Sequence, residues 1–396
     1  MTLELRGTGF AVRDASRPLL VLGPSLGTSA AALWADVVPL LAAEADLLGW
    51  DLPGHGASPA PAGPSTTVEE IADAVLGLID DAQAERGDPG APVWYAGDSA
   101  GGAVGLQLLL DAPDRFAGAA LISTGARIGT PEGWEERAAL VEQAGTPTQV
   151  IGSTERWFAP GFVEREPQVV TRLLASLQTA DRHGYAAVCR ALAAFDVRTR
   201  LGEIATPLVA VAGSDDRPTP VSSLAAIAAG ARRARLRVLE GVAHLPPAED
   251  PEAVAAILRE LLAGRLGASD PERAAAGFAV RREVLGDAHV DRAIGATSAT
   301  TAEFQDLITR YAWGEIWTRP GIDRRMRSAV TLTALVAGGH WAELEMHLRA
   351  ALRNGLSPAE IREILLQTAI YCSVPSANHA FGIADRVLGE DGEAAR

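Results

Sequence analysis

Short apolar runs alternate with amphipathic helical repeats along the first part of the chain. The runs predict strands and cover residues 18–22, 45–50, 92–97, 117–123, 207–213 and 234–239. Helical repeats cover residues 33–43, 68–84, a segment opening near residue 100, and 251–262. Because each predicted strand is apolar almost throughout, both faces of the sheet must be covered by helices. The pattern therefore predicts an α/β domain with a mostly parallel sheet.

Residues 130–196 interrupt this alternation. The segment has no clear strand pattern, and its aromatic side chains fall in helical repeats: Trp134, Trp157, Phe158, Phe162 and Phe195. We interpret it as a helical cap inserted over an active site.

A second domain is expected after the helix at 251–262. The segment from Gly264 to Pro271 is polar and contains glycine, which is typical of a linker. Beyond it only helices are predicted, over residues 304–311, 324–337, 340–353 and 358–372. The last begins with Ser357-Pro358-Ala359-Glu360, a capping sequence. We predict an α/β domain over 1–264 with its cap at about 130–196, a linker over 265–271 and an all-α domain over 272–390.

Charge and composition narrow the possible partners. The net charge of −15 argues against nucleic-acid binding, which needs clustered Lys and Arg. An anionic substrate would need local arginines against this overall field. Two distant cysteines, Cys189 and Cys372, form no disulfide framework and fit a reducing, cytoplasmic location. Neither a signal peptide nor a membrane span is expected.

Candidate chemistry starts at Gly97-Asp98-Ser99-Ala100-Gly101, which fits G-x-S-x-G between a predicted strand and helix. Glycines on both sides of the serine permit a cramped turn that exposes a nucleophilic hydroxyl. The alternative is a glycine-rich turn with an incidental serine.

The serine needs a base and an orienting acid, expected in the chain order Ser, Asp, His. Asp216 follows the strand at 207–213, and His244 follows the strand at 234–239. Asp215 remains the alternative acid. Two backbone N–H groups, of Leu26 and Ala100, are the predicted oxyanion hole, while Ser25 in the same loop is interpreted as a turn residue.

These motifs resemble the 3-oxoadipate enol-lactonase branch of the α/β-hydrolases. The resemblance rests on Leu26-Gly27-Thr28, Asp51-Leu52-Pro53-Gly54-His55-Gly56-Ala57-Ser58 and Ala243-His244-Leu245-Pro246, and covers residues 1–264. Two positions depart from it: Ser25, and Asp98, where the family usually has an apolar residue. It implies a lactone substrate with a carboxylate arm, for which Trp134 and Arg137 of the cap are the binding candidates.

The second domain resembles the 4-carboxymuconolactone decarboxylases. The segments that carry this resemblance span 281–286, 308–317, 324–328, 347–351 and 371–375. It implies decarboxylation without a cofactor or metal, because the lactone ring itself accepts the electron pair. It also implies a trimer or hexamer, so we expect a homo-oligomer joined through this domain.

Decarboxylation asks for carboxylate anchors and a proton donor. Arg324 and Arg325 are the anchor candidates, although each could equally form a structural ion pair. His347 and His379 are the acid candidates, and either could instead be a surface residue. A metal site at His340, Glu343 and His347 is disfavoured. Pro375 stands where related thiol peroxidases have a second cysteine, so Cys372 is interpreted as a buried apolar residue.

The two resemblances fit together, since the decarboxylase product is the lactonase substrate. The sequence therefore predicts a fused enzyme acting on dicarboxylate lactones. Its rivals are a generic serine esterase with a decarboxylase-like assembly domain and a non-catalytic hydrolase-fold binding protein.

Overall fold

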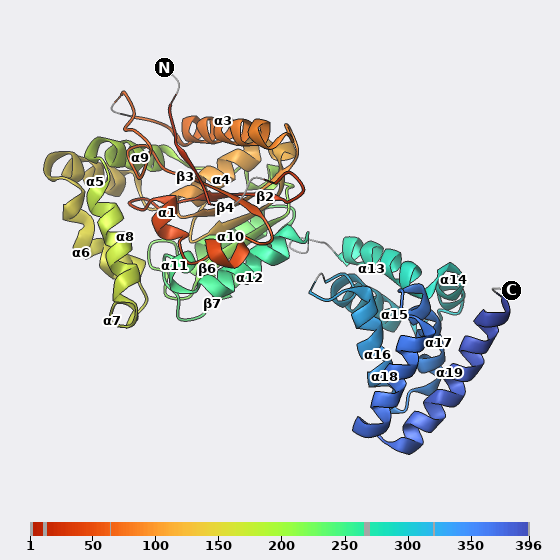
Figure 1. Ribbon diagram of the computed structural model, residues 1–396. Helices are drawn as coiled ribbons and strands as arrows, with labels where there is room; N and C mark the ends of the chain where they lie inside the picture. Colours follow the sequence, from red (N-terminus) through yellow and green to blue (C-terminus); the bar gives the residue numbers. More distant parts are fainter. Residues whose placement is uncertain (1–2, 11–13, 64, 265–269, 320, 395–396) are drawn as a thin grey trace. The chain divides into compact units, whose positions relative to one another are not determined.

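The chain forms two compact units, residues 1–267 and 268–396. The computed structural model describes residues 3–10, 14–63, 65–264, 270–319 and 321–394 (Figure 1). Most of the predicted linker, at residues 265–269, lies outside the described residues. None of the described helices is long and apolar enough to cross a membrane.

The first unit is built on a seven-stranded sheet of order β1-β3-β2-β4-β5-β6-β7. All neighbours are parallel except β1, which runs antiparallel to β3 at the edge. The strands are β1 (Gly7–Gly9), β2 (Leu19–Gly23), β3 (Asp46–Trp50), β4 (Val93–Asp98), β5 (Phe116–Ile122), β6 (Leu208–Gly213) and β7 (Ala234–Leu239). Every residue of β2, β3 and β6 is buried, as predicted for strands covered on both faces.

Helices cover both faces of this sheet, with α3 packed on α4 and α12 packed on α2 (Figure 1). They are α1 (Ala30–Leu33), α2 (Val38–Leu41), α3 (Val68–Arg86), α4 (Ala100–Asp111), α10 (Val221–Gly230), α11 (Pro246–Glu249) and α12 (Pro251–Leu262), with short 3-10 helices at Pro113–Arg115 and Leu201–Glu203. The single helix predicted over 33–43 is wrong: α1 and α2 are separate. Trp34 ends α1, and its indole N–H donates to the Gly23 carbonyl at 3.1 Å.

The cap between β5 and β6 is helical, as predicted. It contains α5 (Pro131–Ala144), α6 (Val150–Trp157), α7 (Phe162–Arg165), α8 (Pro167–Thr179), α9 (Arg182–Ala194) and a 3-10 helix at Thr146–Gln149. The start of α9 packs against the loop after β3, and the contact is made by the backbone of two glycines, Gly184 and Gly54. A Cβ atom on Gly184 would lie 2.5 Å from the Gly54 Cα, and the Asp181 N–H donates to the Gly54 carbonyl at 2.7 Å.

The described part of the second unit is entirely helical. Its elements are α13 (Asp270–Leu285), α14 (Asp287–Gly295), α15 (Ala302–Ile308), the π-helix η4 (Thr309–Ile316), α16 (Arg324–Gly338), α17 (Trp341–Arg353), α18 (Pro358–Tyr371) and α19 (Val374–Ala394). The predicted capping box at Ser357 and Glu360 is present. The helix predicted over 304–311 was wrong in its C-terminal part, because from Thr309 the backbone widens into the π-helix, which packs closely on α13.

Candidate active sites

Ser99 occupies a strained turn between β4 and α4. Its φ of 51° and ψ of −109° place a non-glycine residue in an unfavourable region, and its N–H donates to the Ile122 carbonyl at 2.9 Å. The flanking glycines are required by contact. A Cβ on Gly97 would lie 2.4 Å from the Gly101 carbonyl oxygen, and one on Gly101 would lie 2.7 Å from the Gly23 carbonyl carbon. The turn holds the hydroxyl in the orientation that a nucleophile needs.

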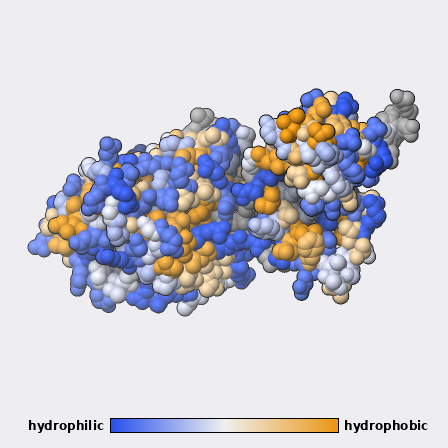
Figure 2. All heavy atoms as spheres, turned by 90° about the horizontal axis from the view of Figure 1, so that it is seen from below, coloured by the Kyte–Doolittle hydropathy of each residue, from blue (hydrophilic) through white to orange (hydrophobic). Residues whose placement is uncertain are grey.

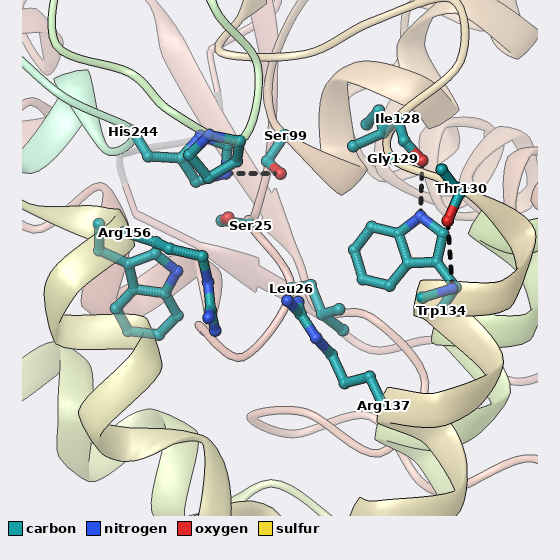
Figure 3. A pocket seen from close by; sticks show the side chains of 13 residues that line it. Ser25, Leu26, Ser99, Ile128, Gly129, Thr130, Trp134, Arg137, Arg156 and His244 are labelled. Atoms are coloured by element: carbon teal, nitrogen blue, oxygen red, sulfur yellow. Dashed lines mark hydrogen bonds between the residues drawn. The ribbon is translucent and has the colours of Figure 1, made fainter.

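The structure brings the three predicted hydrolytic residues together. His244 Nε2 lies 3.0 Å from Ser99 Oγ (Figure 3). On the other side of the ring, His244 Nδ1 lies 3.0 Å from both carboxylate oxygens of Asp216. All three side chains are buried. This geometry lets His244 accept the serine proton while Asp216 fixes the ring and stabilises the imidazolium.

Asp216 and not Asp215 faces the histidine. Asp215 is exposed, whereas Asp216 accepts hydrogen bonds from the Thr219 N–H at 3.0 Å and the Thr219 hydroxyl at 2.7 Å. Burial alone would raise the pKa of Asp216, but the charge and hydrogen bond of His244, with both Thr219 bonds, hold it below its usual value. Thr219 was missed in the sequence, where a threonine three residues after the acid is no distinctive signal.

The predicted oxyanion hole is available for a ligand. Among the residues that the structure describes, neither the Leu26 N–H nor the Ala100 N–H has an acceptor. The loop that carries Leu26 is fixed by the Thr28 N–H, which donates to the Ser25 carbonyl at 3.0 Å, and by the Gly101 N–H, which donates to the Pro24 carbonyl at 2.9 Å. Ser25 is thus a turn residue, as interpreted, and it also faces the cavity.

A cavity of about 210 Å³ lies over Ser99 and reaches into the cap. It is lined by Ser25, Leu26, Ser99, Ile128, Gly129, Thr130, Gly133, Trp134, Arg137, Arg156, Trp157, Pro218 and His244. No acidic residue is among them. Trp134 and Arg137, both predicted, lie together: the guanidinium is 4.8 Å from the indole centroid, and the Trp134 N–H donates to the Ile128 carbonyl at 2.6 Å.

Arg156 is a second cation of this cavity that the sequence analysis missed. Its side chain extends from α6 toward the same space as Arg137 (Figure 3). Partial burial and the nearby charge of Arg137 lower the pKa of Arg156. Two neighbouring guanidinium groups without an acidic lining residue favour an anionic ligand.

Two further carboxyl groups lie near the triad. Glu249 accepts from the Ala159 N–H at 2.8 Å and the Ala243 N–H at 2.9 Å, and burial raises its pKa to about 7. Asp98 is fully buried, and burial, reinforced by the negative charge of Asp216, raises its pKa well above the usual value. Asp98, which departs from the family pattern, does not line the cavity over Ser99.

In the second unit the predicted residues are not gathered at one place. His347 is half-buried on α17 and stacks on Trp317 with a centroid distance of 6.5 Å. His379 is exposed on α19, with its ring 4.5 Å from Trp341. No hydrogen bond or ring contact between described residues joins the two histidines.

The two predicted arginine anchors have carboxylate partners within the protein. Arg324 pairs with Glu283, and Arg325 pairs with Glu360 at 2.5 Å and donates to the Gly355 carbonyl at 2.6 Å. This matches the structural ion pairs that were the alternative.

Burial, together with the nearby His289, lowers the pKa of His347 to about 4, against the opposing charge of Glu343. Cys372, interpreted as buried, is half-buried and free, because it lies at the C-terminal cap of α18. No group of three or more His, Cys, Asp or Glu among the described residues is arranged to hold a metal ion.

Comparison with known proteins agrees with this division of the chain. The model of the alpha/beta hydrolase family matches residues 20–257, and that of the carboxymuconolactone decarboxylase family matches residues 302–386. 3-Oxoadipate enol-lactonase 2 of Acinetobacter baylyi is 34% identical over 241 residues, which cover 61% of this chain and 86% of that protein.

Two further relatives extend the comparison. 4-Carboxymuconolactone decarboxylase of Acinetobacter baylyi is 41% identical over 124 residues, covering 31% of this chain and 92% of the relative. The crystal structure of the enol-lactonase from Burkholderia xenovorans LB400 superposes with a TM-score of 0.61 at 31% identity, covering 65% of this chain and 96% of that one. The chain therefore belongs to the alpha/beta hydrolase family, fused to a carboxymuconolactone decarboxylase domain.

Proposed function

We propose that the chain catalyses two consecutive reactions, decarboxylation of 4-carboxymuconolactone in the second unit and hydrolysis of the resulting 3-oxoadipate enol-lactone in the first. The contact of Ser99, His244 and Asp216 carries the hydrolytic half. Relatives named for these two reactions match the same chain, which supports their combination.

In the hydrolytic reaction, Ser99 Oγ attacks the lactone carbonyl while His244 Nε2 accepts its proton. The N–H groups of Leu26 and Ala100 stabilise the oxyanion. Collapse breaks the ring C–O bond, His244 returns the proton to the departing enol oxygen, and the enol becomes the ketone. Water activated by His244 then releases 3-oxoadipate from Ser99.

The cavity over Ser99 supports a substrate with a carboxylate arm. Arg137 and Arg156 are the cations that this arm can pair with. The Arg137 guanidinium lies over the Trp134 ring, which positions it. A neutral ester would gain nothing from either arginine. This is the feature that favours an enol-lactonase over the rival generic esterase.

In the decarboxylation, the bond between the ring carbon and the departing carboxylate breaks, and its electron pair moves through the ring alkene to the lactone carbonyl oxygen. Protonation of the ring carbon next to that carbonyl then gives the enol-lactone, so one proton is consumed and carbon dioxide released. Of the two acid candidates we favour His347 over His379, because His347 is half-buried between helices and His379 is exposed. The negative charge of a bound dicarboxylate would oppose the burial that lowers the pKa of His347 and so favour its protonated form. The ion pairs of Arg324 and Arg325 make them weaker anchor candidates.

We also propose that the second unit joins copies of the chain into a homo-oligomer. Large apolar side chains lie exposed on it, and Figure 2 shows them gathered in patches. Among the most exposed are Ile370 and Tyr371, each 79% exposed, and Val374 at 67%. Apolar surface of this extent favours a subunit contact.

A spectrophotometric assay with 4-carboxymuconolactone and the purified full-length chain tests the proposed function. We expect loss of the substrate, transient enol-lactone and final 3-oxoadipate. A chain that hydrolyses neutral esters but leaves carboxymuconolactone unchanged would be the generic esterase. A chain that fails to react with a fluorophosphonate at Ser99 would be the binding protein.

A further inference from the structure

A buried arginine without an acidic partner lies in the second unit. Arg281 on α13 is only 6% exposed, and within the described residues its one side-chain hydrogen bond is from Nη1 to Gln305 Oε1 at 3.2 Å. Its Nε has no acceptor there. The adjacent Arg282 is more exposed and pairs with both Asp287 and Asp291. A buried cation is costly unless it is paired, so Arg281 is in the condition expected of a group that receives an anion from outside.

A second buried polar group without a partner lies on the facing helix. The Thr309 hydroxyl, at the first residue of the π-helix, has no hydrogen-bond partner among the described residues, and Thr309 is 1% exposed. A Cβ on Gly277 would lie 2.1 Å from the Thr309 carbonyl oxygen. Gly277 and Thr309 thus meet one helical turn from the contact of Arg281 with Gln305. The two groups without partners thus lie one turn apart, where α13 packs on the end of α15 and the start of the π-helix. Segments of π-helix occur frequently at functional sites.

Two histidines and a pair of stacked tryptophans lie beside the packing of α13 on the π-helix. Trp313 stacks on Trp317 at 5.2 Å, and Trp317 stacks on His347. His289 on α14 is near enough to Arg281 for that charge to lower its pKa, although burial is the larger cause. His289 also lines a surface hollow of about 450 Å³ between α14 and α17. The two acidic lining residues Asp287 and Glu345 are paired with Arg282 and Arg349.

We propose that Arg281 anchors a substrate carboxylate, and that the decarboxylation site lies where α13, the π-helix and α17 meet, with the Thr309 hydroxyl as a second contact. This inference rests on the proposed function and names the anchor of its second reaction. It replaces Arg324 and Arg325, whose guanidinium groups already have carboxylate partners.

The chemistry decides which carboxylate Arg281 holds. The departing group loses its charge as carbon dioxide forms, so a cation paired with it would stabilise the ground state more than the transition state. The other carboxylate, on the side arm, keeps its charge throughout. Arg281 therefore binds the retained carboxylate, which leaves the departing one free to lose its solvation, and His347 lies on the ring side to supply the proton.

The test uses the full-length chain with Arg281→Met, which keeps the length of the side chain and removes its charge. We expect the KM for 4-carboxymuconolactone in the decarboxylation step to rise at least roughly 30-fold, with the melting temperature unchanged or higher. The matched control is Arg282→Met, which removes a half-buried, ion-paired neighbour and should leave KM unchanged. An unchanged KM in folded Arg281→Met would overturn the proposal.

Calorimetric titration with adipate, a stable dicarboxylate, separates this inference from the proposed function. If the wild-type chain does not decarboxylate carboxymuconolactone, the proposed function fails, while adipate binding lost in Arg281→Met and kept in Arg137→Gln still supports the anion site. Should Arg281→Met not fold, Arg281→Lys keeps the charge but not the planar fork, and weaker adipate binding is expected. Equal affinity of Arg281→Lys and wild type would overturn the anchor.

Discussion

The two units of the chain differ in their exposed apolar surface and in how the polar groups of their candidate sites are paired. In the first unit Asp216 and His244 are hydrogen-bonded to each other, and Asp216 also accepts two hydrogen bonds from Thr219 of the same unit. In the described part of the second, the buried Arg281 has no acidic partner and donates only to Gln305. Large apolar side chains that are exposed among the described residues number three in the first unit, namely Leu140, Ile151 and Val238. In the shorter second unit they are Phe278, Ile294, Phe304, Leu307, Tyr311, Ile316, Ile322, Met326, Val330, Leu366, Ile370, Tyr371 and Val374.

The difference is between a site whose polar groups are paired within the unit and a site whose arginine has no acidic partner there. The hydrolytic unit holds its nucleophile, base, acid and oxyanion donors in one covalent frame. The helical unit has a buried arginine and exposed apolar faces, which we have proposed to receive a ligand and neighbouring copies of the chain. Substitutions in the first unit should therefore act locally, whereas those in the second should also report on ligand and assembly.

The largest effect is expected for Ser99→Ala, which removes the nucleophile. Lactone hydrolysis should fall by roughly 10⁴-fold or more while decarboxylation continues, because the two sites lie in different units. Enol-lactone should then accumulate and be visible by its absorbance. Ser223→Ala, on α10 away from the triad, is the control. Equal loss of both activities in folded Ser99→Ala would contradict the separation of the two sites.

Charges placed on the apolar surface of the second unit should dissociate the oligomer. We expect the double variant Ile370→Glu, Tyr371→Glu to weaken association at least about 100-fold, measured by light scattering, because two largely exposed apolar side chains would become charged inside a contact. Ile151→Glu is the control, since Ile151 is 77% exposed in the first unit. Residues 1–264 expressed alone should be an active monomer. A monomeric full-length chain, or a 1–264 fragment that still associates, would show that the second unit does not hold the oligomer together.

A smaller effect is expected in the cap. Arg137→Gln and Arg156→Gln should each raise the KM for the enol-lactone roughly 10- to 100-fold and leave that for a neutral ester nearly unchanged, because one charge-assisted contact is lost. Arg165→Gln, a cap arginine that lies over Phe162, is the matched control. If the ratio of the KM for the enol-lactone to the KM for the neutral ester stays constant, the arginines do not bind the carboxylate.

The smallest effect concerns Asp98, a fully buried acid of the first unit whose two carboxylate oxygens have no hydrogen-bond partner within the described residues. Its pKa is raised in the folded state, so the folded chain binds a proton that the unfolded chain releases above about pH 4. Stability should therefore fall as pH rises from that value toward the folded pKa. Asp98→Asn should remove this slope and raise Tm by a few degrees at pH 8, corresponding to about 1 kcal/mol. Exposed Asp215→Asn should change neither, and an unaltered slope in Asp98→Asn would show that another group causes it.

Patterns local in sequence predicted the first unit well. Strand β6 lies within a residue of the apolar run at 207–213, because a buried parallel strand has to be apolar throughout. Strand β7 matches the run at 234–239, although it contains Arg235 and Arg237 and none of its residues is buried. The order of Ser99, Asp216 and His244 predicted a constellation that the folded chain does assemble, since strand ends of a parallel sheet meet at one edge.

Features that depend on distant contacts could not be predicted. The edge strand β1 is only three residues long and has no periodicity to detect. Arg281 sits beside Arg282 in the sequence, and only the packing of α13 on the π-helix makes one buried and the other half-buried. Arg156 likewise reaches the cavity through the placement of α6, which no local pattern encodes.

The glycine contact between the cap and the loop after β3 bears on how the enzyme could be adapted to bulkier lactones. Gly54 and Gly184 meet backbone to backbone, so no side chain there can be trimmed to give the cap room, and any addition would force it away from the sheet. The roof of the cavity is thus set by main-chain geometry on that side. Engineering for larger rings would have to begin at Trp134 and Trp157, which line the cavity and whose side chains can be shortened without moving the cap.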